Sequence, residues 1–217
     1  MNEKDNIQLY WRECLAVREA MQSDEFTSQI LSLTDKVWNT YKKRGSVYAC
    51  ANGGGAGLVA NLVADWGLHS FMLDDKSQAL DIPRLKVSNL CVDMSMITAA
   101  ANDHGFENAI LEQIRGIMGE NDMLIAFSGS GNSSNVLKAF EYANTLGAFT
   151  VCVSRGDGGK AFGVAKMNIV VPGTSQFPGQ VGKNDNNLHA EDVFVSLTHI
   201  ITGLLRQRVQ EAYKNKI

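Results

Sequence analysis

Apolar positions recur at a helical spacing near both ends of the chain. From about residue 6 to residue 43, apolar side chains return every three or four positions, which predicts two helices. The same spacing from Ala190 to Val209 predicts one long closing helix. The middle of the chain differs, because short apolar runs alternate there with glycine-rich turns and further helical patterns.

The short apolar runs predict buried strands. We expect strands at Val47–Cys50, 85–93, Met123–Phe127, Phe149–Ser154 and Met167–Val171. We expect helices after them, one ending near Trp66, others at 95–101, 106–118 and 133–146, and a short one after Lys160. Strands that alternate with helices are typical of a parallel sheet covered on both faces, so the pattern predicts an α/β fold.

Composition and charge narrow the class of protein. A chain of 217 residues suits one α/β domain, and no linker or repeat divides it. The net charge of -3 supplies no basic stripe for nucleic acid. The sequence contains no run of about 18 apolar residues, so it predicts no membrane span. Because Cys14, Cys50, Cys91 and Cys152 lack metal or redox spacing, we expect reduced thiols in a cytoplasmic protein.

The segment from Ser128 to Ser134 is the strongest candidate for a binding site. It follows a predicted buried strand, alternates serine with glycine, and leads into a helical pattern. Backbone N–H groups and the positive end of the helix dipole favour an anion at such a turn. Gly129 and Gly131 allow the backbone to approach a ligand closely. The segment therefore predicts an anion site, most plausibly for a phosphate.

Two nucleotide-binding motifs do not match this loop, and one simpler interpretation stays open. A Walker A loop requires a lysine that is absent here, and a dinucleotide fingerprint requires glycine at the position of Ser134. No nucleotide cofactor is therefore expected. The simpler interpretation is a turn that only caps a helix, since serine is a common N-cap residue.

A second glycine-rich turn follows the first predicted strand. It runs from Asn52 to Gly57, and its alternative interpretation is a flexible turn without a ligand. Asn61 and Asp65 follow four residues apart, on one face of the emerging helix. Ligands bind beyond the carboxyl ends of strands in open parallel sheets, so we expect both turns to face one site.

Together these segments resemble the sugar isomerase (SIS) domain family and, within it, the phosphoheptose isomerases. The resemblance covers almost the whole chain from about residue 6, and the serine–glycine and Gly-Asp-Gly-Gly-Lys blocks are its most specific parts. The matching segments are Cys50–Gly54, Ala101–Phe106, Phe127–Ser133, Gly156–Lys160, and Glu191-Asp192 with Thr198–Ile200.

The resemblance implies a fold, a function and an assembly. The fold would be a three-layer αβα sandwich with a parallel sheet, flavodoxin-like, as one SIS domain over residues 1–217 with an N-terminal helical hairpin at about 6–43. The function would be aldose–ketose isomerisation of a sugar phosphate of the sedoheptulose 7-phosphate type. The assembly would be a homotetramer with active sites between subunits.

The resemblance also implies roles for individual residues. The phosphate would be held by Ser128, Gly129, Ser130 and Ser133. The sugar would be bound by Asn52, Gly53, Gly54, Asn102, Asp103 and Glu191. Asp65 and His199 would be the catalytic acid–base pair. Some family members hold zinc between these helices, and the corresponding ligands of a divalent metal here would be Asn61, Asp65, Glu191 and His199.

The chain departs from the family pattern mainly around the reaction centre. It has Gly55 for Ser, Asn61 for His, Asp65 for Glu, His69 for Arg, Gly129 for Thr and Glu191 for Gln. A changed substrate, a changed metal or a loss of catalysis would each explain these substitutions. Asparagine is an uncommon zinc ligand, which weakens the metal interpretation.

Several residues keep a second interpretation, and so does the function. Glu191 also suits a solvated helix face, and His199 a buried core position. His69 and His189 also suit ordinary surface or interface positions, and the polar segment from Gln176 to Asn187 is a candidate functional loop. The alternative function is a non-catalytic SIS domain that binds a sugar phosphate as a regulatory or adaptor protein. Because acid–base groups are retained, we expect the enzyme.

Overall fold

A computed structural model describes residues 2–73, 75–180 and 188–214. Residues 181–187 of the polar loop at Gln176–Asn187 lie outside these ranges. The described elements alternate as the sequence predicts, and the bounds of the strands are β1 Ser46–Ala51, β2 Lys86–Asn89, β3 Met123–Phe127, β4 Phe149–Arg155 and β5 Met167–Val171. The helices are α1 Glu3–Ala20, α2 Asp24–Lys42, α3 Gly55–Gly67, α4 Met94–His104, α5 Leu111–Ile114, α6 Ser134–Thr145 and α7 Leu188–Lys214.

The five strands form one parallel sheet in the order β2-β1-β3-β4-β5. Val47 of β1 pairs with Met123 of β3 in register, and Met123 pairs with Phe149 of β4. The chain first proceeds from β1 to β2 at one edge and then returns to place β3 on the other side of β1. The order therefore reverses between β1 and β3, which is where open α/β sheets bind their ligands.

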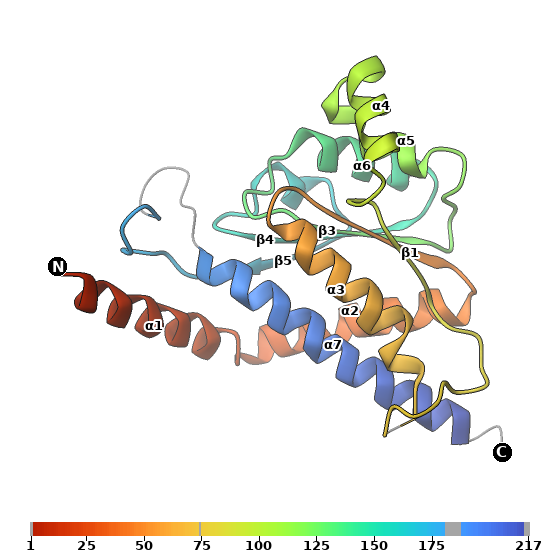
Figure 1. Ribbon diagram of the computed structural model, residues 1–217, viewed down its shortest axis with the longest axis horizontal. Coiled ribbons are helices and arrows are strands. Elements are labelled where there is room, and N and C mark those ends of the chain that lie inside the picture. Colours follow the sequence, from red (N-terminus) through yellow and green to blue (C-terminus); the bar gives the residue numbers. More distant parts are fainter. Residues whose placement is uncertain (1, 74, 181–187, 215–217) are drawn as a thin grey trace.

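Helices cover both faces of the sheet, so the α/β sandwich is confirmed. On one face lie α1, α2, α3 and α7, and on the other α4, α5 and α6 (Figure 1). Successive strand residues alternate between the two cores, as the pleat of a strand requires. Ala49 and Ile125 belong to the core under α3 and α7, whereas Cys50 and Ala126 belong to the core under α6.

The predicted helix at 106–118 is wrong. The structure has only a 3-10 turn at Phe106–Asn108 and the single turn of α5. Glycines with positive φ bound the segment, Gly105 at +87° and Gly116 at +76°, and that conformation cannot continue an α-helix. The apolar spacing arises because Ile110, Ile114 and Met118 all pack into the core under α6.

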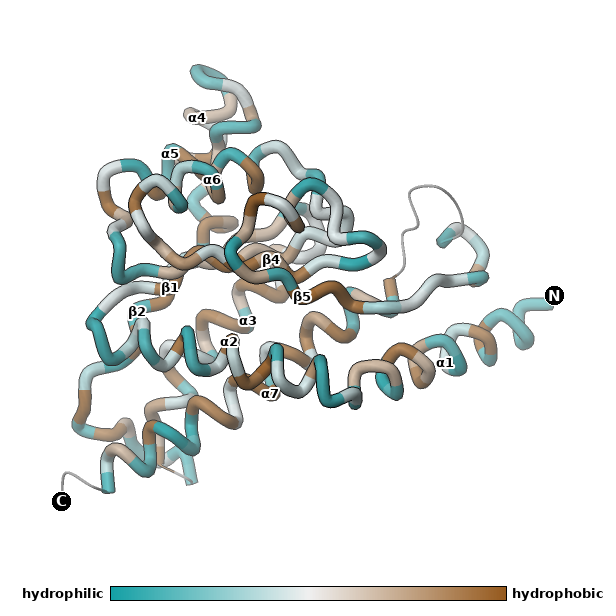
Figure 2. The backbone as a smooth tube through the Cα atoms, turned by 180° about the vertical axis from the view of Figure 1, so that it is seen from behind, coloured by the Kyte–Doolittle hydropathy of each residue, from teal (hydrophilic) through white to brown (hydrophobic). Residues whose placement is uncertain are grey.

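Helix α1 projects away from the sheet and carries an apolar stripe (Figure 2). Ile7, Trp11 and Leu15 lie four residues apart and are 59, 62 and 60% exposed. Spacing of this kind places the three side chains on one helix face. The chain thus presents an apolar helix face that its own core does not cover. Among the described residues, no helix is long and apolar enough to span a membrane.

Candidate functional site

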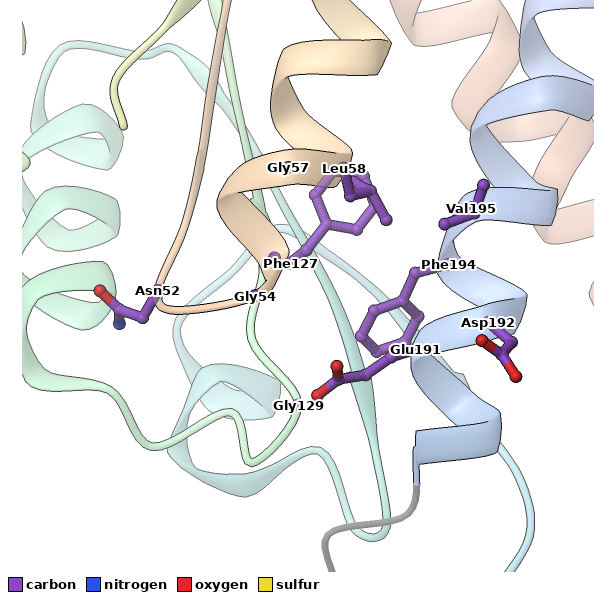
Figure 3. A pocket seen from close by; sticks show the side chains of 11 residues that line it. Asn52, Gly54, Gly57, Leu58, Phe127, Gly129, Glu191, Asp192, Phe194 and Val195 are labelled. Carbon is purple, nitrogen blue, oxygen red and sulfur yellow. The ribbon is translucent and has the colours of Figure 1, made fainter. Parts of the chain in front are cut away.

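A pocket of about 390 Å³ opens where the strand order reverses, between the first turns of α3 and α7 (Figure 3). It lies beyond the carboxyl ends of β1 and β3, so both glycine-rich turns contribute to it as expected. Its walls are formed by Asn52, Gly54, Gly55, Gly57, Leu58, Phe127, Gly129, Glu191, Asp192, Phe194 and Val195.

The Ser128–Ser133 loop is held in shape by the Gly156–Lys160 turn. Gly131 adopts a φ of +62°, and its carbonyl accepts a hydrogen bond from Ala161 N (2.9 Å). The Asn132 side chain accepts from Lys160 N (3.0 Å). A Cβ on Gly131 would lie 1.9 Å from Gly158 O, so only glycine fits there. The two sequence blocks that look most specific are therefore two halves of one backbone structure.

The hydroxyls of this loop are largely free for a ligand. Ser133 occupies the N-cap position of α6, yet its side chain makes no capping hydrogen bond. Ser128 Oγ donates only a long bond to Ser133 Oγ (3.4 Å), and Ser130 Oγ accepts one from Asn132 N (3.2 Å). The capping interpretation of Ser133 is therefore not supported, and the loop keeps donors for an anion.

Asn52 takes part in an amide pair that the sequence did not reveal. Its Nδ2 donates to Asn135 Oδ1 (3.0 Å), and Asn135 Nδ2 donates back to Asn52 Oδ1 (2.8 Å). Asn135 is buried on α6, and Figure 3 shows the Asn52 side chain pointing away from the pocket. The pair joins the two glycine-rich turns, while Gly53 (φ +56°) and Gly54 form the bend between them and α3. The only signal of this amide pair in the sequence is the presence of an asparagine in the first turn of α6.

A second group of side chains lies beyond the pocket, where α3 and α7 are in contact. We call Asn61, Asp65, His69 and His199 the Asp65 cluster. Asp65 Oδ1 lies 2.9 Å from His69 Nδ1, and Asp65 Oδ2 lies 2.9 Å from Asn61 Nδ2 and 3.7 Å from His199 Nε2. Asn61 Nδ2 also lies 3.2 Å from His199 Nε2. One carboxylate is thus shared by an amide and two imidazoles.

The Asp65 cluster lies farther along α3 and α7 than the pocket, whose described lining does not include its four residues. Asp65 follows Leu58 by seven residues on α3, about 10 Å along the axis, and His199 follows Val195 by four residues on α7, about 6 Å. Trp66 Nε1 donates to Thr198 O (3.3 Å), which locks the two helices together at this level. The Asp65 side chain is largely buried, whereas those of His69 and His199 are 43 and 58% exposed. The interpretation of His199 as a buried core residue is therefore wrong.

The four expected metal ligands do not make a cation site. Asn61 directs its NH₂ group at Asp65, because a carboxylate can only accept, and an NH₂ group offers no lone pair to a cation. Glu191 points from α7 toward Gly129, where its Oε1 lies 3.8 Å from the position of an ideal Cβ (Figure 3). Among the described residues, no three His, Cys, Asp or Glu side chains are arranged to hold a metal ion. The donor set here therefore does not fit zinc.

Asn102 and Asp103 lie elsewhere on the chain. Both are exposed on α4, where Asn102 Nδ2 donates to Asp103 Oδ1 (2.7 Å). Figure 1 shows α4 on the far side of the sheet from α7. The Nδ1 atom of the neighbouring His104 lies 3.4 Å from Glu112 Oε1. Within one chain, the structure does not bring Asn102 and Asp103 to the pocket.

His189 is buried and not on the surface, which corrects its ordinary surface interpretation. Its Nε2 lies 2.6 Å from Glu13 Oε2, and its Nδ1 lies 3.4 Å from Cys14 Sγ. Burial acts to raise the pKa of Glu13, but hydrogen bonds from Gln176 N, His189 and Ser175 outweigh it and lower that pKa below its usual value. This network fixes the start of α7 against α1, and so places Glu191 beside the pocket.

Comparison with known proteins gives one family and one fold. Residues 9–154 match the model of the SIS domain. A phosphoheptose isomerase of Helicobacter pylori (strain P12) is 28% identical over 95% of this chain and 98% of its own length. That of Fusobacterium nucleatum is 32% identical over 77% of this chain and 81% of its own.

Solved structures agree with this fold. A phosphoheptose isomerase from Francisella tularensis superposes with a TM-score of 0.80 at 20% identity, covering 95% of this chain and all of the other. One from Neisseria gonorrhoeae gives 0.79 at 20% identity with the same coverage. At that identity the likeness concerns the fold, and it confirms the expected three-layer architecture.

Proposed function

The chain belongs to the SIS domain family, and from this premise we propose that it is a phosphosugar isomerase, interconverting a ketose phosphate and an aldose phosphate of the sedoheptulose 7-phosphate type. One observation carries the proposal. Gly129 of the loop with free hydroxyls lines the pocket between α3 and α7, and the carboxylate–imidazole pair of Asp65 and His199 joins the same two helices farther along. The loop suits a phosphate, and the pair suits proton transfer at the other end of the sugar.

The proposed reaction moves one proton between two neighbouring carbons and another between two oxygens. Asp65 takes the proton from the carbon beside the carbonyl, while His199 gives a proton to the carbonyl oxygen, which yields an enediol. Reversal on the other carbon completes the exchange. Asn61 and His69 hold the Asp65 carboxylate in place through the 2.9 Å contacts. No step requires a metal, in agreement with the donor set.

The non-catalytic alternative is less well supported, because a regulatory domain has no need for an acid–base pair in contact. Incubation with sedoheptulose 7-phosphate, followed by NMR of the product, tests the two functions. We expect an aldose phosphate to accumulate. Binding without turnover, across a panel of ketose phosphates and with or without divalent metals, would favour the regulatory function.

The loop hydroxyls should carry much of the affinity for the phosphate. We expect the double variant Ser130→Ala/Ser133→Ala to bind a sugar phosphate at least about tenfold more weakly, because each lost charge-assisted bond is worth about 1.5–3 kcal/mol. Calorimetry measures the change. Ser95→Ala, on α4 away from the pocket, is the matched control. Unchanged affinity in the double variant would show that the loop has a structural role and does not bind the phosphate through these hydroxyls.

We further propose that the chain assembles as a homotetramer with sites between subunits, in the cytoplasm. The apolar stripe on α1 supports a second copy as its cover, and the remoteness of Asn102 and Asp103 suits residues that serve a neighbour's site. Four free cysteines suit a reducing compartment.

Light scattering should therefore give a mass of about four chains. Trp11→Glu, which puts a charge into the stripe, should lower that mass. Ala16→Glu, at an exposed position on another face of α1, should not. A monodisperse wild-type monomer at micromolar concentration would contradict the assembly.

A further inference from the structure

Arg155 ends strand β4 at the edge of the sheet where the pocket opens, and nothing described so far uses its side chain. Its backbone N–H donates to Gly129 O (3.0 Å), which holds it against the Ser128–Ser133 loop. The side chain is half-buried, and its Nε is buried without a hydrogen-bond partner among the described residues. A buried donor without an acceptor is rare in native proteins and calls for a reason, such as a ligand.

Gly129 allows the guanidinium to lie close to the loop. An ideal Cβ on Gly129 would lie 3.2 Å from Arg155 Nε and 3.8 Å from Nη2. The same point lies 3.8 Å from Glu191 Oε1. The guanidinium and the carboxylate therefore flank one point at the pocket wall. They do not form an ion pair with each other in the part of the chain that the structure describes.

The charge of the pocket lining indicates why a guanidinium beside it matters for an anionic ligand. The described residues that line it include the carboxylates of Glu191 and Asp192 and no lysine or arginine. A phosphate monoester carries a charge of about -1.5 to -2 at pH 7. The loop hydroxyls and backbone N–H groups are neutral, so they leave that charge uncompensated. A guanidinium offers both the charge and a forked set of donors that matches a phosphate.

We propose that Arg155 is a specificity-determining residue, whose guanidinium donates to the phosphate of the substrate from beside Gly129. The proposal rests on the proposed function, because it takes the ligand to be a phosphate ester in this pocket. Arg155 then selects a doubly charged phosphate over a neutral sugar, while Glu191, whose Oε1 lies 3.8 Å from the same Cβ position of Gly129, is left for the hydroxyls of the sugar.

Calorimetry with inorganic phosphate tests the role of Arg155 without depending on turnover. Arg155→Met, which keeps an apolar stem of similar length, should weaken phosphate binding by about 10- to 100-fold, the usual effect of losing a charge-assisted hydrogen bond. Arg155→Lys should restore part of the affinity. Arg84→Met removes an exposed arginine in the same way at a distant loop and should leave binding unchanged.

A double-mutant cycle separates phosphate contact from a structural role. Gly129→Ala places a methyl group 3.2 Å from Arg155 Nε and should displace the guanidinium. In a chain that already carries Arg155→Met, adding Gly129→Ala should lower the affinity for phosphate little further. Effects that simply add would mean that the two residues act separately, and this would overturn the proposal.

The outcomes distinguish this proposal from the isomerase function. If Arg155→Met binds phosphate as tightly as the wild type, Arg155 has no such role, even where the wild type isomerises its substrate. If Arg155→Met loses phosphate binding and Arg155→Lys regains part of it, the role stands, even where no sugar phosphate is turned over. A wild type that does not bind phosphate would overturn the proposal as well.

Discussion

Asp65→Asn and His199→Ala should each lower kcat by about 10²–10⁴-fold, the contribution expected of a general acid or base. The affinity for the sugar phosphate should stay nearly unchanged, because the phosphate loop lies on a different turn from the Asp65 cluster. The two substitutions should not be additive, since each disables the same step, the formation of the enediol. Turnover by NMR and affinity by calorimetry measure the two quantities separately.

An exposed residue away from the pocket supplies the control. Asp35→Asn removes a carboxylate on α2 that pairs with Arg208, and it should keep wild-type kcat. A wild-type rate in either Asp65→Asn or His199→Ala would remove the pair from the mechanism. Treatment with a chelator should leave the wild-type rate unchanged, and a loss that added divalent ions restore would show that a metal binds after all.

Among the variants proposed here, Gly131→Ala should lower the free energy of unfolding the most. The added Cβ would lie 1.9 Å from Gly158 O, and a backbone carbonyl cannot move aside as a flexible side chain can. A non-glycine residue at φ +62° costs about 1–3 kcal/mol, and the overpacking costs about 1–3 kcal/mol more. Urea unfolding should show a lower midpoint, and the variant should bind phosphate poorly because the loop loses its shape.

Gly163→Ala is the matched control for Gly131→Ala. It lies at the end of the neighbouring 3-10 turn, has no positive φ, and has nothing within 4 Å of an ideal Cβ. We expect its unfolding midpoint to stay close to that of the wild type. Equal midpoints for the two variants would show that the contact between the two turns is not needed.

The strands and the two glycine-rich turns follow from local sequence. A buried parallel strand is a short apolar run, and β1, β3, β4 and β5 all lie within a residue or two of the predicted positions. The turn at Gly131 could be recognised because glycine readily adopts its φ of +62°, whereas its contact with Gly158 O joins segments distant in the chain. The helix predicted at 106–118 failed because apolar spacing does not show where a positive φ interrupts a segment.

The function class was also accessible from the sequence, through the order and spacing of its motifs. The partners of individual side chains were not. That His199 lies beside Asp65, that Asn135 joins Asn52, and that Arg155 lies against Gly129 are contacts between elements distant in the chain.

Such contacts depend on how α3, α6 and α7 are seated on the sheet, and that is decided by the packing of the two cores as a whole. The sequence by itself therefore determined the fold, and it predicted the phosphate loop and the acid–base residues. Only the tertiary structure decided that Asn61 directs donor hydrogens at Asp65, that Glu191 lies beside Gly129, and that His189 belongs to the interior.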